Sequence, residues 1–189
     1  MRADPMSGGD VEMDEAPASP RVDAQTFRQA MRQLAGGVCA ISAGDQASER
    51  TGMTVTSVVS LSLDPAELVV SVNQGSSSWP VISATGRFGV NLLSDAQAAV
   101  AQRFAGQGGV RGAARYEGAQ WHVTPEGVWL LEDAPVALAC TVEQVWTRHS
   151  HALVVGRITH VRCTAPAGST HGAGPLLYWQ GSYGRFTAA

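Results

Sequence analysis

The sequence predicts a mainly β protein, an antiparallel β-barrel with a few short helices. About eight short segments resemble strands, because their side chains alternate or run apolar between Gly, Pro, Asn and Asp turns. Strands and helices do not alternate regularly, which argues against a doubly wound parallel sheet. The 189 residues suit a single domain. This number of strands predicts a closed barrel with helical caps.

The first residues are expected to lie outside this barrel. Residues 1–22 hold five acids, two arginines and three prolines without an apolar period, which is typical of a disordered tail. Residues 23–189 would then form the domain. The tail has no basic stretch ahead of an apolar run, so the sequence predicts no secretory signal and a cytoplasmic protein.

A short helix is expected to open the domain. Asp23 can cap its start, and Gly36-Gly37 ends it. Its apolar residues have the i, i+3, i+4, i+7 spacing of one helix face: Phe27, Ala30, Met31 and Leu34.

Three strands are predicted in the first half of the chain. Residues 38–42 form the first, and residues 53–63 alternate throughout and predict one long strand. The apolar face of this long strand carries Val55, Val59, Leu61 and Leu63. Asp64-Pro65 makes a turn, after which residues 68–73 return as an apolar strand.

The second half begins with a serine-rich loop at 74–78 and a short helix at 79–84. Ser94 and Gln97 have the spacing of a capping box, which predicts a helix through Phe104. The Gly- and Arg-rich segment 106–118 is expected to be a mobile loop. The remaining strands are predicted at 87–93, 120–123, 128–130, 136–146, 151–163 and 176–180.

Several classes of chemistry are excluded by composition. All 13 basic residues are Arg, so lysine-dependent mechanisms and a Walker phosphate loop are ruled out. There is no GxSxG, no HExxH and no GxGxxG after a strand. No basic stripe suggests nucleic acid, and no apolar run is long enough to span a membrane. The cysteines 39, 140 and 163 are far apart, which indicates free thiols and no metal site.

Neutral hydrogen-bonding groups form the candidate site. Hydroxyl and amide side chains cluster on one strand face and in the following loop: Thr54, Thr56, Ser60, Asn73, Ser76, Ser77 and Ser78. Such a cluster can bind a phosphate where a loop leads into a helix, with Arg103 as the charged partner. A solvated strand face and a run of capping serines would explain the same residues.

Two histidines give a second candidate. His149 and His151 are two apart on an expected strand and would point the same way. A metal pair would lack a third ligand. A single functional histidine at the mouth of a site, or an ordinary surface histidine, are the alternatives.

Read in order, seven segments resemble the short-chain flavin reductases that serve two-component flavin-dependent monooxygenases. Among them, Gly52-Met53-Thr54-Val55-Thr56-Ser57 through Asp64-Pro65 is similar to the flavin-binding strand and turn of that family. The segments are residues 27–38, 52–65, 68–78, 88–93, 103–106, 151–156 and 175–186.

This resemblance implies an FMN-binding split β-barrel that reduces FMN, with FAD possible, at the expense of NADH or NADPH. It also implies a homodimer with the flavin at its interface, and a monooxygenase partner that receives reduced flavin. The implied flavin-binding residues are Thr54, Val55, Thr56, Ser57 and Ser60 along the ring, Asn73, Ser76, Ser77 and Ser78 toward the ribityl phosphate, and Arg103 and Phe104 at the flavin edge.

The same resemblance implies the reacting side of the site. His151 corresponds to the histidine that borders the nicotinamide, and Tyr183 lies in the segment that closes over it. Ser150 and Arg157 depart from the family pattern, in which acids often stand at these positions. Arg157 would either meet the 2′-phosphate of NADPH or be a solvated strand residue. Two other functions stay open: a tightly bound flavin acting on an organic substrate, and a non-catalytic flavin-binding protein.

Overall fold

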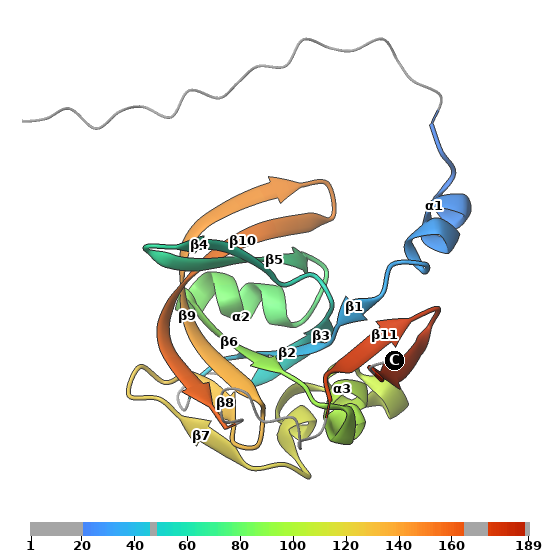
Figure 1. Ribbon diagram of the computed structural model, residues 1–189. Coiled ribbons are helices and arrows are strands. Elements are labelled where there is room, and N and C mark those ends of the chain that lie inside the picture. The colour runs from blue at the N-terminus through green and yellow to red at the C-terminus, as the bar shows by residue number, and fades with distance from the viewer. Residues whose placement is uncertain (1–20, 46–48, 165–173, 188–189) are drawn as a thin grey trace, which may run out of the picture.

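A seven-stranded antiparallel sheet forms the body of the protein in the computed structural model, which describes residues 21–45, 49–164 and 174–187 (Figure 1). The strand order is β3-β2-β6-β9-β10-β5-β4. The strands are β2 (Cys39–Ala43), β3 (Thr51–Val55), β4 (Val59–Leu63), β5 (Ala66–Asn73), β6 (Arg87–Leu92), β9 (Val136–Arg148) and β10 (His151–Cys163). Apart from Arg21 and Val22, the predicted tail lies outside the described residues.

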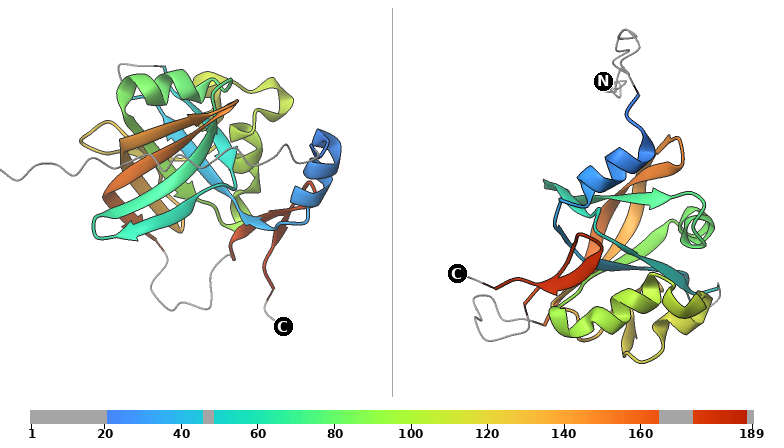
Figure 2. Two further views of the ribbon diagram at one scale, coloured as in Figure 1. Left: turned by 90° about the horizontal axis from the view of Figure 1, so that it is seen from above. Right: turned by 90° about the vertical axis from the view of Figure 1, so that its right-hand side faces the viewer.

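Two small sheets and short helices surround this curved sheet. The small sheets are β1 (Gly36–Gly37) with β11 (Leu176–Trp179) and β12 (Ser182–Arg185), and β7 (Trp121–Val123) with β8 (Trp129–Leu131). The helices are α1 (Ala24–Met31), α2 (Ser78–Thr85) and α3 (Ala98–Phe104), with 3₁₀ turns η1 (Asp95–Gln97), η2 (Gln107–Gly109) and η3 (Gly112–Tyr116). Figures 1 and 2 show α2 covering one end of the barrel and α1 standing to its side.

The barrel is split rather than closed. The edge strands β3 and β4 do not pair with each other within the described residues, so the expectation of a closed barrel is wrong and that of a split barrel is confirmed. The predicted strand 53–63 is in fact two strands, β3 and β4, at opposite edges of the sheet. Ser57 lies between them, and its hydroxyl donates to the Ser71 carbonyl at 3.1 Å and accepts from the Ser71 N–H at 3.3 Å.

The core has two parts, separated by the main sheet. One fills the barrel and includes Ile41, Val70, Phe88 and Val154. The other packs α3 and η3 against the outer face of the sheet and is built on Phe104, Tyr116 and Leu130. Gly156 is required here because a Cβ at this position would lie 2.5 Å from the Phe88 ring.

Local capping signals are confirmed. The Asp23 carboxylate caps α1 by accepting from the N–H groups of Gln25 and Thr26, each at 3.0 Å. The capping box of Ser94 and Gln97 is also formed, at the start of η1.

Two expected burial patterns are not found. The apolar stripe of α1 is exposed, as is the apolar side of β4, where Leu63 is 90% exposed. Nothing within the described part of this chain covers either surface.

The segment 106–118 is not an extended loop: it forms η2 and η3 and buries Tyr116. None of the helices in the described ranges is long and apolar enough to cross a membrane.

Candidate functional site

The main candidate cavity lies along the second half of β3. It has a volume of about 570 Å³, within the roughly 300–1,000 Å³ usual for small-molecule and cofactor sites. The predicted residues Thr54, Val55 and Thr56 form one wall, and the predicted Tyr183 forms part of the other. Four of the sequence-predicted residues, from two distant segments, therefore meet in one cavity.

The wall opposite β3 comes from the C-terminal hairpin. Tyr178 on β11 pairs with Tyr183 on β12, and their ring centres are 5.3 Å apart. Partial burial raises the pKa of Tyr183, and so does neighbouring Tyr178. Both effects disfavour the phenolate, so Tyr183 offers the cavity a neutral hydroxyl.

Two amide side chains complete the cavity. These are Gln102 from α3 and Gln107 from η2. Thr54 is held in place beside them, because its hydroxyl donates to the Ala101 carbonyl at 2.6 Å. The cavity thus presents neutral hydrogen-bonding groups and no charged side chain among the described residues.

The serine loop lies near the other end of β3. Asn73 shapes this loop, because its Oδ1 accepts from the Gly75 N–H at 2.8 Å. Ser77 approaches the first residue of β3, with its hydroxyl 3.0 Å from that of Thr51. The hydroxyls of Ser76 and Ser78 are buried without a hydrogen-bond partner among the described residues. A polar ligand here would meet groups that the fold leaves unsatisfied.

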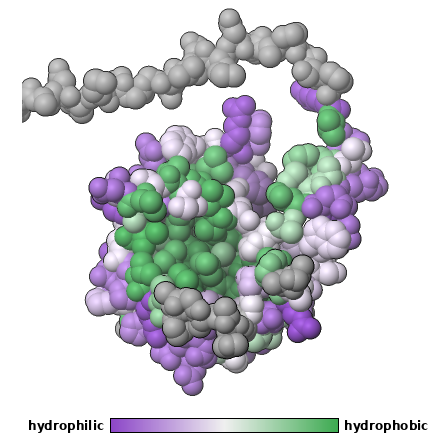
Figure 3. Space-filling model, in the orientation of Figure 1, coloured by the Kyte–Doolittle hydropathy of each residue, from purple (hydrophilic) through white to green (hydrophobic). Residues whose placement is uncertain are grey.

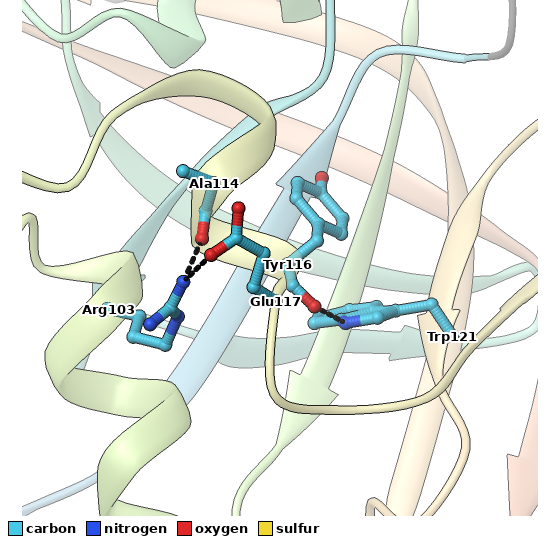
Figure 4. A network of polar contacts seen from close by, with 5 residues as sticks. All are labelled: Arg103, Ala114, Tyr116, Glu117 and Trp121. Atoms are coloured by element: carbon cyan, nitrogen blue, oxygen red, sulfur yellow. Dashed lines mark hydrogen bonds and ion pairs between the residues drawn. The ribbon is translucent and has the colours of Figure 1, made fainter.

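Arg103 and Phe104 are occupied by contacts within the protein. The Arg103 guanidinium pairs with Glu117 at 2.9 Å and donates to the Ala114 carbonyl (Figure 4). The Phe104 ring is 1% exposed and packs against Tyr116 and Trp121. Neither side chain lines the main candidate cavity or the apolar groove beside β4.

His151 begins β10 at an exposed position, opposite Asn73 of β5. Its Nδ1 lies 2.9 Å from the Ser150 hydroxyl, which orients the ring. The end of β10 that carries His151 and the C-terminal hairpin that carries Tyr183 lie apart in every view (Figures 1 and 2). His149 sits in the preceding turn at φ 52° rather than on a strand. The described residues contain no cluster of three metal ligands.

Ser60 faces a different hollow. It lines an apolar groove of about 480 Å³ between β4 and the strands β2 and β6, together with Leu63, Leu92 and Leu138. Figure 3 shows the apolar surface gathered on this face of the barrel. Ser57 lines neither this groove nor the main cavity.

The comparison with protein families identifies the family of this chain. A model of the flavin reductase like domain matches residues 31–187. The chain belongs to this family. The match covers the barrel, the candidate cavity and the C-terminal hairpin, and it confirms the family predicted from the seven sequence segments.

Characterised relatives agree with this assignment. The chain is 39% identical over 167 residues to an NADH:riboflavin 5′-phosphate oxidoreductase of Streptomyces pristinaespiralis, covering 87% of this chain and 89% of the relative. It is 30% identical over 167 residues to a flavin reductase of Pseudomonas putida, covering 88% and 92%.

Solved structures share the fold. Nitrilotriacetate monooxygenase component B from Mycobacterium thermoresistibile is 28% identical with a TM-score of 0.75, over 86% of each chain. The styrene monooxygenase flavin reductase from Pseudomonas putida S12 is 27% identical with a TM-score of 0.71, over 86% of this chain and 99% of the other. These findings confirm the mainly β fold and the prediction of an NAD(P)H-dependent flavin reductase.

Sequence reasoning missed part of the cavity walls. Tyr178 had a usable signal, since it lies in a segment that carries the resemblance. Gln102 and Gln107 had none, because their place depends on how α3 and η2 pack against β3. Arg111 and Arg115 line a further cavity, of about 420 Å³, together with Thr51 and Ser77. They were also missed, because the segment that holds them was expected to be a mobile loop.

Proposed function

We propose that this reductase uses NADH to reduce FMN and releases the reduced flavin to a separate monooxygenase. The observation that carries the proposal is the neutral cavity beside β3. Hydride transfer from the nicotinamide to the flavin moves two electrons and a proton together, so it needs a dry, well-positioned site rather than a charged acid or base. The walls built by Thr54, Thr56, Gln102 and Tyr183 suit that requirement.

The residues of the chain have distinct roles in this proposal. Backbone and hydroxyl groups of Thr54–Thr56 bind the flavin ring along one edge, and Tyr183 covers it from the C-terminal hairpin. His151, whose ring is oriented by the Ser150 hydroxyl, contacts bound NADH outside this cavity, because it lies apart from Tyr183, and it donates no proton to a reacting atom.

The ion pair made by Arg157 favours NADH over NADPH as the co-substrate. Its guanidinium pairs with Glu143 at 3.1 Å, so the charge that could meet a 2′-phosphate already has a partner. The relative from S. pristinaespiralis is named for NADH and riboflavin 5′-phosphate, which supports the same choice of co-substrate and of FMN.

A homodimer and a monooxygenase partner belong to the proposal. The exposed apolar surfaces of α1 and β4 support a second copy, because large apolar patches are costly to leave in water. The names of two structural neighbours, a monooxygenase component and a monooxygenase flavin reductase, support the partner. The cytoplasmic location stays a prediction.

An anaerobic turnover experiment tests the activity. Protein, excess FMN and NADH are mixed, and the flavin and nicotinamide absorbance bands are followed, then the mixture is repeated with NADPH. We expect many equivalents of FMN to be bleached per protein, faster with NADH. Reduction of at most one equivalent that stays bound would instead indicate a prosthetic flavin and overturn the proposal.

A further inference from the structure

The C-terminal hairpin that walls the main candidate cavity is held differently at its base and at its tip. At the base, the Leu176 N–H donates to the Leu93 carbonyl at 2.9 Å, and Leu176 is buried in the core. At the tip, the hairpin lies beside the end of α1 (Figures 1 and 2). Residues of the tip line the cavity directly: Gly181, Ser182 and Tyr183. The position of the tip therefore shapes the cavity wall.

Tyr183 lies on the less supported strand of this hairpin. Within the described part of the chain, β11 has a strand neighbour on each side in the small sheet, whereas β12 pairs with β11 alone. The Tyr183 ring also packs against the core cluster that contains Phe104. A movement of the tip would therefore change the angle of the ring over the cavity without releasing the ring from the protein.

Three hydrogen bonds join the hairpin tip to the residues that follow α1. The Gln180 N–H donates to the Arg32 carbonyl at 3.0 Å. The Trp179 indole N–H donates to the Gln33 carbonyl at 3.2 Å. The third bond joins two side chains, because Gln180 Nε2 donates to Gln33 Oε1 at 3.1 Å. Among the described residues, these are the hydrogen bonds that link residues 24–33 to a distant part of the chain.

Gln180 adopts a backbone conformation that suits glycine or asparagine better. Gln180 and Gly181 form the two-residue loop between β11 and β12, with φ values of 49° and 87°. Two positive φ values are typical of a type I′ turn, in which Asn-Gly is the preferred pair. A glutamine in this conformation is strained by its Cβ. Its side-chain amide bonds to Gln33, so the residue suits the contact with α1 better than it suits the turn.

The residues on the other side of this contact are tied to the same small sheet. The chain passes from Gln33 into β1, where Gly36 pairs with Tyr178 of β11. Residues 32–37 thus run along the hairpin and also hold its tip. The bond between Gln33 and Gln180, here called the glutamine clamp, completes this enclosure.

We propose that Gln33 and Gln180 are positioning residues for flavin reduction, because the glutamine clamp fixes the hairpin tip so that Tyr183 covers the bound ring. This inference rests on the proposed function and specifies what holds one wall of its site. In the proposed homodimer the second copy covers α1, so the glutamine clamp also connects the subunit interface to the flavin.

The test uses a variant in which stability and binding are expected to move in opposite directions. Gln180→Gly removes the side-chain bond and suits the positive φ of the turn better than glutamine does. We expect an unchanged or higher melting temperature, together with FMN binding about threefold weaker, within the net contribution of one neutral hydrogen bond. Flavin fluorescence measures the dissociation constant without nicotinamide. The residual fluorescence of bound FMN at saturation should also rise, because a tyrosine ring quenches the flavin when the two are in contact.

Gln33 supplies the matched variants. Gln33→Ala removes the acceptor and should match Gln180→Gly in FMN binding, whereas Gln33→Glu keeps an acceptor oxygen and should bind FMN like the natural protein. The double variant Gln33→Ala, Gln180→Gly should be no weaker than either single variant, since each removes the same bond. Gln29→Ala makes the same change on α1 away from the tip and serves as the control, with both readouts unchanged.

Tyr183→Ala distinguishes failure of this inference from failure of the proposed function. It should weaken FMN binding at least as much as Gln180→Gly does and raise the residual fluorescence. If it does so while Gln180→Gly and Gln33→Ala bind FMN like the natural protein, the glutamine clamp does not position the wall. A lower melting temperature in both clamp variants, with unchanged residual fluorescence, would assign the pair to stability alone. Unchanged FMN binding in Tyr183→Ala would remove the flavin from this cavity and overturn both proposals.

Discussion

At the residue scale, the site depends on a few side chains whose partners are fixed by the fold. Thr54 is bonded to the Ala101 carbonyl, and Ser77 meets Thr51. The hydroxyl clusters were predictable from alternation and loop composition. The charged partner predicted for them was wrong, because the Arg103 guanidinium pairs with Glu117 and donates to the Ala114 carbonyl.

His151 should act on the nicotinamide and not on the flavin. For His151→Ala we expect the KM for NADH to rise about tenfold, because one hydrogen bond to NADH is lost, while the FMN dissociation constant stays within about twofold. Steady-state kinetics and flavin fluorescence titration measure the two quantities. His122→Ala, at an exposed position on β7, is the control. Equal losses in both quantities would contradict the role given to His151.

The three thiols should differ sharply in reactivity. Burial raises the pKa of Cys39 to about 11 and that of Cys140 to about 12, whereas Cys163 is exposed. Since the thiolate is the reactive form, a disulfide reagent at pH 8 should label one thiol quickly in the folded protein and all three in denaturant. Cys163→Ala should abolish the fast phase. A fast phase of two or three thiols would show that the interior strands open readily.

At the element scale, local sequence signals predicted the capped helix starts well. The wrong predictions fell where contacts between distant parts of the chain determine the structure. The Asp23 cap and the box of Ser94 and Gln97 depend on residues three or fewer apart. The alternating run 53–63 gave no sign of a break, because the break is stabilised by Ser57 bonding to the distant Ser71 backbone. The same holds for segment 106–118, which is anchored far away in sequence.

Tyr116 provides that anchor. Its hydroxyl donates to the Thr51 carbonyl at 2.7 Å and accepts from the Ala43 N–H at 3.3 Å. Tyr116→Phe should therefore lower the free energy of unfolding by about 1–2 kcal/mol, measured by urea titration. Tyr178→Phe, at a more exposed ring, should change it by less than about 0.5 kcal/mol. Equal small changes in the two variants would show that the segment is held by other contacts.

At the scale of the whole molecule, exposed apolar surface is the main feature that the single chain does not explain. Phe27 on α1 is 60% exposed, Leu34 just beyond the end of α1 is 68% exposed, and β4 leaves Leu63 uncovered. Helical periodicity predicted the helical part of the stripe, Phe27 to Met31, but placed Leu34 on a helix that ends before it. It also could not reveal that nothing within the described chain packs against this surface. A second copy of the chain would account for this surface, in line with the proposed homodimer.

The dimer can be tested through α1 alone. Equilibrium sedimentation should give a dimer for the natural protein and a monomer for the triple variant Phe27→Ser, Met31→Ser, Leu34→Ser, because about 25 cal/mol would be lost per Å² of apolar contact. The pair Gln25→Ser and Gln29→Ser changes the same helix outside the stripe and should remain dimeric. A natural protein that sediments as a monomer would remove the second copy from the account.

The central claim is that the flavin ring binds along β3 and is reduced there. A crystal structure of the FMN complex tests it most directly. We predict electron density for the ring between Thr54–Thr56 and Tyr183, with the phosphate toward the serine loop that holds Ser77. Density for the ring in the apolar groove lined by Ser60 and Leu63, or at a surface away from β3, would contradict the account.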